Sequence, residues 1–176
     1  MQAIAQFRQG LAIERREGKF RRNAAGWVLV VLNGLAALNS TFFFLGVMKT
    51  GVVGWLMMNT CAPSIALFVI GFLFGSPVLM VGASVLMFRY GAGGLFAFGW
   101  DGYNIIPQIG HILMTLAVIY VLLCIVRNRA WRMLGLGLGL GVAILIPLTL
   151  VQTWWFNAHP VMLEMLFSGD WSSTGQ

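Results

Sequence analysis

Arg89 is the residue in this sequence that makes the strongest chemical demand on its surroundings. It lies near the middle of an apolar stretch from Pro77 to Trp100, and no carboxylate lies inside any hydrophobic segment of the chain. A guanidinium stays protonated in proteins. At mid-bilayer depth it is unfavourable by several kcal/mol unless water, backbone carbonyls, an anion or another subunit receives it. We therefore expect Arg89 and its neighbour Tyr90 to contact an anion or a partner subunit. The structural alternative is that Arg89 ends a half-helix over Pro77–Phe88 and donates to its last carbonyls.

A second group of polar side chains falls within the first two apolar stretches. Pro63 removes a backbone donor and frees a carbonyl near Asn59, and transporters use such discontinuities to build sites at mid-membrane depth. A plain kink satisfied by neighbouring groups is the alternative. Together with Arg89, these side chains predict a small polar cavity lined by Asn33, Asn39, Asn59 and Ser64.

His111 is the one histidine that falls within an apolar stretch. A single imidazole is enough for axial ligation of haem, so a haem- or pigment-binding role for His111 is one hypothesis. The structural alternative is a hydrogen bond between helices, with Gln108 or Thr115 as partner. Since the chain has two histidines in all, a pair of haems with two histidine ligands each is excluded. We expect no metal site and no other cofactor.

Four glycines alternate with leucines in the last apolar stretch. They form two overlapping G-x-x-x-G pairs, which place small residues on a helix face and allow close contact with another helix. A phosphate-binding loop is excluded, because no strand precedes the run and it lacks the P-loop lysine. We expect helix packing at Gly135, Gly137, Gly139 and Gly141.

The sequence contains no pattern typical of an enzyme. No pair of carboxylates is available within the apolar stretches for acid–base catalysis. The chain has no H-E-x-x-H motif, and no serine has an evident histidine or lysine base beside it in sequence. We therefore expect a protein without catalytic activity.

The composition indicates where these residues lie. Hydrophobic residues make up 59% and charged residues 9% of the 176 residues, whereas soluble domains have about 45–50% and about 25%. Several apolar runs reach the roughly 20 residues needed to cross a hydrocarbon core of about 30 Å. We predict an all-α polytopic membrane bundle with five spans, at Gly26–Val47, Val52–Phe74, Pro77–Trp100, Ile105–Val126 and Met133–Phe156.

Both ends of the chain are expected to carry a short helix at the membrane surface. Ile4, Phe7 and Leu11 recur at helical spacing in a basic leader, residues 1–24, which is typical of an amphipathic interfacial helix. A disordered leader is the alternative. After the transmembrane bundle, residues 25–157, Pro160 starts a second short helix over Val161–Phe167 in the tail, residues 158–176.

The basic residues predict the orientation of the bundle. Six precede the first span, and Arg127, Arg129 and Arg132 lie in the loop between the fourth and fifth spans. Lys and Arg are concentrated on the cytoplasmic side of membrane proteins. This predicts an N-terminus in the cytoplasm, a C-terminus outside and, as location, a bacterial inner membrane. The same rule explains the net charge of +6, so we expect no nucleic-acid partner.

Three functional hypotheses follow. The lone Arg89, an odd number of spans and almost no soluble mass favour a non-catalytic subunit of a multi-protein inner-membrane complex for transport, secretion or energy conversion. Its partners would be other membrane subunits or a second copy of the chain, together with membrane lipids. The second hypothesis is a small transporter or channel for a polar or anionic solute. The third is a haem- or pigment-binding membrane subunit that uses His111.

Overall fold

The computed structural model describes residues 13–14, 19–100 and 105–168. The predicted leader helix depends on Ile4, Phe7 and Leu11, which lie outside the described residues, as do residues 101–104 and 169–176. The described elements are β1 (Ile13–Glu14), β2 (Lys19–Phe20), α2 (Ala24–Phe42), the π-helix η1 (Phe43–Val47), α3 (Gly51–Met58), α4 (Cys61–Phe74), α5 (Pro77–Met87), the π-helix η2 (Phe88–Ala92), α6 (Gly93–Ala97), α7 (Ile105–Arg127), α8 (Trp131–Ala158) and α9 (Pro160–Ser168).

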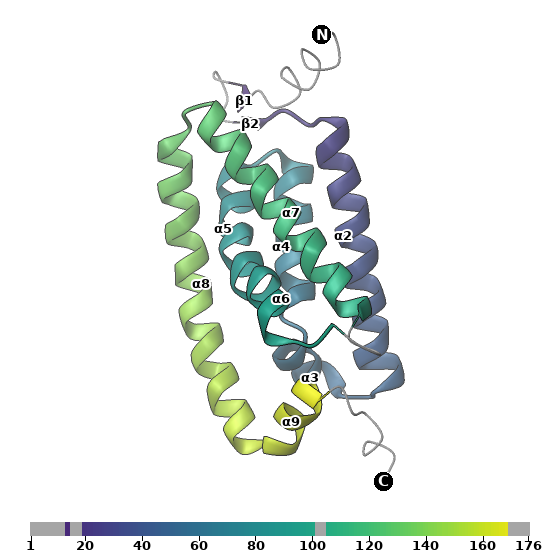
Figure 1. The fold of residues 1–176 in the computed structure, drawn as a ribbon. Helices are drawn as coiled ribbons and strands as arrows, with labels where there is room; N and C mark the ends of the chain where they lie inside the picture. Colours follow the sequence, from purple (N-terminus) through teal and green to yellow (C-terminus); the bar gives the residue numbers. More distant parts are fainter. Residues whose placement is uncertain (1–12, 15–18, 101–104, 169–176) are drawn as a thin grey trace.

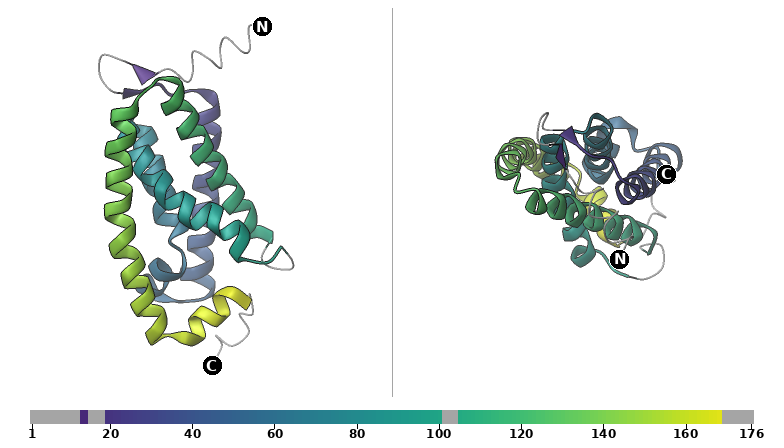
Figure 2. Two further views of the ribbon diagram at one scale, coloured as in Figure 1. Left: turned by 60° about the vertical axis from the view of Figure 1, so that its left-hand side comes forward. Right: turned by 90° about the horizontal axis from the view of Figure 1, so that it is seen from above.

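The helices run up and down in a bundle, and each predicted span has a counterpart (Figures 1 and 2). Four continuous stretches are long and apolar enough to cross a membrane: Ala24–Val47, Pro77–Ala97, Ile105–Arg127 and Trp131–Ala158. The bent pair α3–α4 makes a fifth when it is counted as one span. The prediction of a helical bundle with about five stretches long and apolar enough to cross a membrane is therefore confirmed.

The two ends of the bundle differ in charge. Arg21 and Arg22 precede α2, and Arg127, Arg129 and Arg132 surround the α7–α8 turn, at the upper end in Figure 1. We call this the basic end. The α2–α3 connection, which carries Lys49, and the α8–α9 turn lie at the opposite end.

Local sequence explains the tight α4–α5 reversal at the basic end. Gly75 ends α4 in the left-handed conformation, with φ 64°, which a residue without a Cβ adopts readily. The Ser76 hydroxyl caps α5 by accepting from the Leu79 N–H at 3.3 Å. Pro77 follows in the first turn, where its missing N–H needs no partner. The reversal places α4 and α5 side by side.

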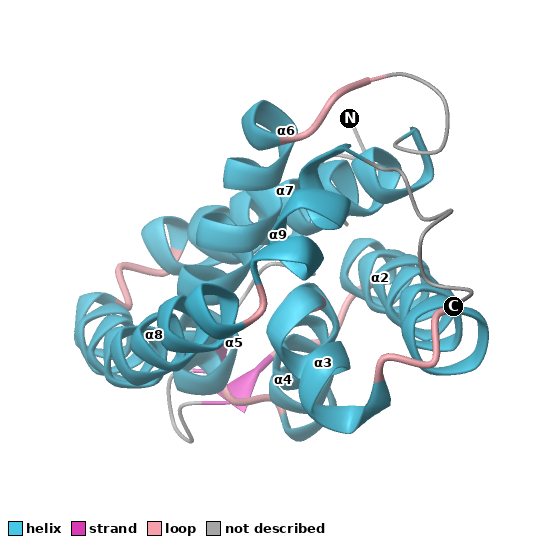
Figure 3. Ribbon diagram, turned by 90° about the horizontal axis from the view of Figure 1, so that it is seen from below, coloured by secondary structure: helices cyan, strands magenta, loops and turns pink. Residues whose placement is uncertain are grey.

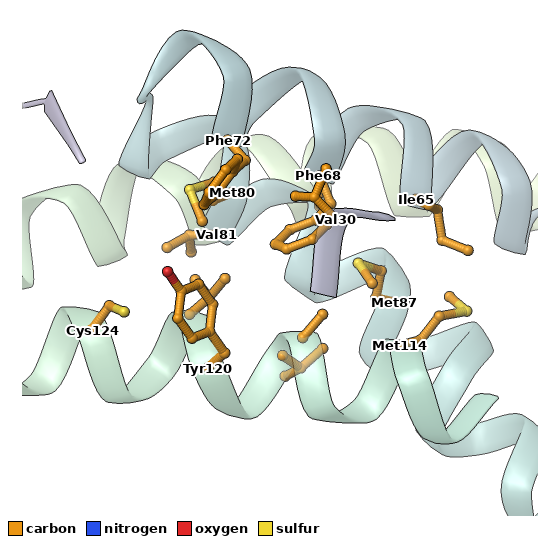
Figure 4. Close-up of a cluster of buried hydrophobic side chains, with 14 of the residues drawn as sticks. Val30, Ile65, Phe68, Phe72, Met80, Val81, Met87, Met114, Tyr120 and Cys124 are labelled. Carbon is orange, nitrogen blue, oxygen red and sulfur yellow. The ribbon is translucent and has the colours of Figure 1, made fainter. Parts of the chain in front are cut away.

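The main core lies between α2, α4, α5 and α7. Phe68 and Phe72 of α4, Met80 and Met87 of α5 and Met114 of α7 have almost no exposed surface, and their side chains meet at the centre of the bundle (Figure 4). Lipid tails are as apolar as these side chains, so the core stabilises the bundle chiefly through close van der Waals packing.

The second predicted span, Val52–Phe74, is interrupted, as the sequence allows, but not at Pro63. The axes of α3 and α4 differ by 79°, and the break falls at Asn59, whose φ and ψ of −124° and 52° are not helical. Pro63 does not make this break. It lies in the first turn of α4, where a proline removes no helical hydrogen bond.

The third span is continuous but irregular at Arg89. Residues Phe88–Ala92 form a π-helical turn, in which the Gly93 N–H donates to the Phe88 carbonyl. Such turns are rare in proteins as a whole, and many of those that occur lie at functional sites. Gly91 and Gly94 allow close approach of α7, because a Cβ at these positions would lie 2.7 Å from the Met114 Cβ and 2.6 Å from the His111 ring.

The predicted helix after His159 is present as α9. Figure 3, which views the molecule from the end opposite the basic end, shows α9 lying across the bundle. Met165 is buried, and Met162 and Leu166 pack on a second, smaller core of Phe44, Met57, Met58 and Trp155.

Candidate ligand cavity

A cavity of about 1000 Å³ lies in the half of the bundle away from the basic end. Its wall comes from α2 and η1, the α3–α4 break, η2 and α6, and from α7, α8 and α9. Most lining residues are apolar, but a polar group converges on it from several helices. We call it the polar cavity; its polar lining residues are Asn39, Ser40, Asn59, Thr60, Cys61, Arg89, Tyr90, His111, Thr149, Gln152 and Thr153.

Three interruptions of regular helix meet at this cavity. The π-helices η1 and η2 and the α3–α4 break all contribute lining residues. Irregular backbone at membrane depth is tolerated where it is covered by protein or lines a cavity. The first residues of α4, from Cys61, also lie at the cavity, and a helix N-terminus carries a partial positive charge. The interruptions therefore place irregular backbone at the wall of the cavity.

Arg89 places a full positive charge at the cavity. Within the part of the chain that the structure describes, its guanidinium makes no hydrogen bond and no ion pair, and its Cζ lies 5.7 Å from the centre of the Tyr90 ring. A Cβ on Gly93 would be 3.6 Å from Nη1 of Arg89, so the side chain extends along η2 towards α6. None of the cavity's described lining residues is a carboxylate. The electrostatic field of the cavity therefore favours an anion.

Tyr90 begins a chain of hydrogen bonds across the cavity wall. Its hydroxyl donates to Oε1 of Gln152 on α8 at 2.7 Å. Nε2 of Gln152 donates in turn to the Met57 carbonyl at 2.7 Å, and lies 3.5 Å from Oγ1 of Thr60. In a continuous helix, the Met57 carbonyl would accept a hydrogen bond from the backbone N–H four residues later. Because α3 ends before that residue, the carbonyl is free to accept from a side chain. Gln152 thus satisfies this carbonyl and connects α8 to the break and to η2.

Two of the four asparagine and serine residues predicted for the cavity line it. Asn39 and Asn59 are lining residues, and Nδ2 of Asn59 donates to Oγ of Ser40 at 3.1 Å. Asn33 and Ser64 are buried elsewhere. Asn33 donates to the Leu113 carbonyl of α7 at 3.2 Å, which ties α2 to α7, and Ser64 donates to the Thr60 carbonyl at 2.7 Å.

His111 lies at the edge of the cavity in a packed position. Its Nδ1 is 3.0 Å from Oε1 of Gln108, a partner considered from the sequence, but both residues belong to α7, so this contact is within one helix and not between two. Its ring stacks on Phe98 with centroids 5.6 Å apart and rests against Gly94. These contacts fit a role in joining α6 to α7. No group of three or more potential metal ligands occurs among residues 13–14, 19–100 and 105–168.

The glycines of α8 divide into two faces. A Cβ on Gly137 would lie 2.4 Å from the Val81 Cβ, and one on Gly141 would lie 2.6 Å from the Val85 Cβ, so both seat α8 against α5. Gly135 and Gly139 meet no atom within 4 Å. The predicted packing role therefore has a partner helix for one pair, while the other pair lies on an open face of the described chain.

Sequence reasoning did not single out Gln152 or Thr149 as cavity residues. Gln152 carried a usable signal, since it is an isolated amide in an apolar run, and polar side chains inside membrane helices usually face the bundle interior. No protein-family model, curated protein or solved structure matches the chain. The geometry of the cavity is thus the basis for any functional conclusion.

Proposed function

We propose that this protein is a small membrane transporter or channel that binds a polar or anionic solute in the polar cavity. The observation that supports this most strongly is the guanidinium of Arg89, which lines the cavity without a hydrogen bond or ion pair to any described residue. A cation at this depth requires a compensating group. A bound anion would supply this compensating group, so the protein itself needs no permanent counter-ion for Arg89.

The backbone around the cavity supports the same class of function. Secondary transporters bind solutes near the bilayer midplane beside discontinuous helices, where half-helix N-termini face anionic groups. Here the α3–α4 break, the start of α4 and Arg89 all lie on one cavity. The described lining residues offer hydroxyl, amide and guanidinium donors but no paired carboxylates, which favours binding over acid–base catalysis.

Anion binding tests the proposal. The thermal unfolding temperature of the detergent-solubilised protein would be measured with phosphate, sulfate, acetate and benzoate, and anions that stabilise it would then be tested for uptake into proteoliposomes. We expect Arg89→Gln to weaken binding by about 2 kcal/mol, a roughly 30-fold rise in Kd, because a charge-assisted contact is lost. Lys49→Gln, which removes an exposed charge at the same end of the bundle, is the matched control. The proposal fails if no anion stabilises the wild type, or if the two variants behave alike.

The orientation belongs to the same proposal. With the basic end in the cytoplasm of a bacterial cell, the cavity lies in the outer half of the inner membrane. The concentration of Arg at that end supports this placement. An alkaline phosphatase fused to the C-terminus is expected to be active and a fused fluorescent protein dark, and the reverse pattern excludes this orientation.

A non-catalytic subunit of a larger membrane complex is the second candidate. The open face of α8 favours it, because Gly135 and Gly139 have no neighbour within 4 Å and small residues at a helix surface allow close association. Purification from native membranes in mild detergent, followed by mass spectrometry, would reveal a stoichiometric partner. Gly139→Leu should release this partner, whereas a fully active monomer excludes the candidate.

A further inference from the structure

Arg89 lines a second hollow that adjoins the polar cavity. This groove of about 570 Å³ lies between α5, α7 and α8. We call it the apolar groove; it is lined by Val81, Ser84, Val85, Phe88, Arg89, Ala92, Gly93, Phe96, Val118, Val121, Leu122, Leu138 and Leu145. The side chain of Arg89 thus stands where the two hollows meet.

The apolar groove offers one unsatisfied polar group. Ser84 is buried, and its hydroxyl donates to the Met80 carbonyl at 2.9 Å. This leaves the guanidinium of Arg89 as the one polar lining group without a hydrogen bond among the described residues. The surface beside it is apolar and open, since Phe88 and Phe96 are 65% and 91% exposed. Within a membrane, such a surface faces hydrocarbon.

These features identify the occupant by its chemistry. We infer that the apolar groove holds an acyl chain of an anionic phospholipid, with the lipid phosphate paired to Arg89. The chain matches the apolar walls, and the phosphate supplies the charge that a guanidinium at this depth requires. From Arg89 to Val81 the groove follows eight residues of helix, about 12 Å, which is long enough for a segment of an acyl chain beside the guanidinium.

This inference rests on the proposed function and names its substrate class. A lipid phosphate held at Arg89 is adjacent to the polar cavity, because Gly93 and Arg89 line both hollows. The headgroup therefore reaches the hydroxyl and amide groups of the cavity while the acyl chain stays in the groove. An anionic amphiphile uses both hollows at once, whereas a small anion uses only one.

The experiment compares lipids with a headgroup alone. The thermal unfolding temperature of the detergent-solubilised protein would be measured with phosphatidylglycerol, phosphatidylcholine and glycerol 3-phosphate. Phosphatidylglycerol at about 100 times its Kd should raise the unfolding temperature by roughly 5–10 °C, and phosphatidylcholine should have little effect. Arg89→Gln should abolish the response to both anionic compounds. Ala92→Trp, which fills the apolar groove, should abolish only the response to phosphatidylglycerol.

Two controls keep the outcomes distinct. Leu136→Trp adds the same ring to an exposed position of α8 outside both hollows and should respond as the wild type does. Phosphatidylglycerol with a photoreactive acyl chain should label groove residues of the wild-type protein, which needs no variant to fold. Equal stabilisation by both lipids, an unchanged response of Ala92→Trp, or labelling outside the groove overturns the lipid inference. Absence of any anion response that depends on Arg89 overturns the proposed function as well.

Discussion

The two glycine faces of α8 make opposite predictions for the same substitution. At Gly137 an added Cβ would lie 2.4 Å from the Val81 Cβ and 2.9 Å from the Val78 carbonyl. Normal carbon–carbon contact is about 3.5–4.0 Å, so α5 and α8 must separate locally by roughly 1 Å. At Gly139 an added Cβ meets nothing within 4 Å. Alanine therefore strains the helix pair at one position and leaves it unchanged at the other.

The expected magnitudes follow from two opposing effects. Overpacking costs about 1–3 kcal/mol, while replacing an interior helical glycine by alanine gains up to about 1 kcal/mol. Gly137→Ala should therefore lower the free energy of unfolding by about 1–2 kcal/mol, and Gly139→Ala should leave it unchanged or raise it by up to about 1 kcal/mol. The two variants should differ by roughly 1–3 kcal/mol, or about 2–12 °C in Tm for a chain of this length.

Thermal unfolding of the purified protein, followed by far-UV circular dichroism in a mild detergent, measures this difference. Gly141→Ala should behave as Gly137→Ala does, since its Cβ would lie 2.6 Å from the Val85 Cβ. Protein that mass spectrometry shows to carry no partner is used for this comparison, so Gly139→Ala reports on the isolated chain. If the Gly137 and Gly139 variants unfold at the same temperature, or in the reverse order, the α5–α8 contact described above is wrong.

Three further predictions concern the cavity. Tyr90→Phe removes the hydroxyl that donates to α8 at 2.7 Å and should lower the free energy of unfolding by about 1 kcal/mol, as measured by thermal unfolding; an unchanged stability would mean that this hydrogen bond does not form. Cys61, which lines the polar cavity, should react with a small thiol reagent in folded protein, while the buried Cys124 should react only after unfolding. Mass spectrometry of the labelled protein distinguishes the two cysteines, and equal labelling rates would contradict the cavity. Gly94→Ala forces a Cβ to within 2.6 Å of the His111 ring and should lower Tm by several degrees, so a Tm equal to that of the wild type would argue against this contact.

The helices that are long and apolar enough to cross a membrane were predictable because their signal lies in run length and composition. Runs of apolar residues long enough to cross the membrane coincide with four continuous spans and one bent pair. The position of the break in the second span was not predictable from Pro63, because a proline is compatible with the first turn of a helix. The structure instead breaks the helix just before that turn, at Asn59.

The lining of the cavity was predictable only in part, because it depends on which side of each helix faces the centre. Asn33 and Asn39 lie in the same apolar run, six residues apart, so they point to different sides of α2. The sequence does not indicate that the side of Asn33 meets α7 while that of Asn39 meets the cavity. Gln152 was missed for the same reason, since its role depends on a carbonyl freed by a break in another helix.

The position of α9 has a consequence for kinetics. Leu163, Leu166 and Phe167 of this helix contribute to the cavity wall, and the Phe167 ring stacks on Phe98 with centroids 5.3 Å apart. A single residue, His159, joins α9 to α8. Under the proposed function, a solute that leaves the cavity past these residues requires α9 to move, so its residence time would depend on that local opening as well as on its affinity for Arg89.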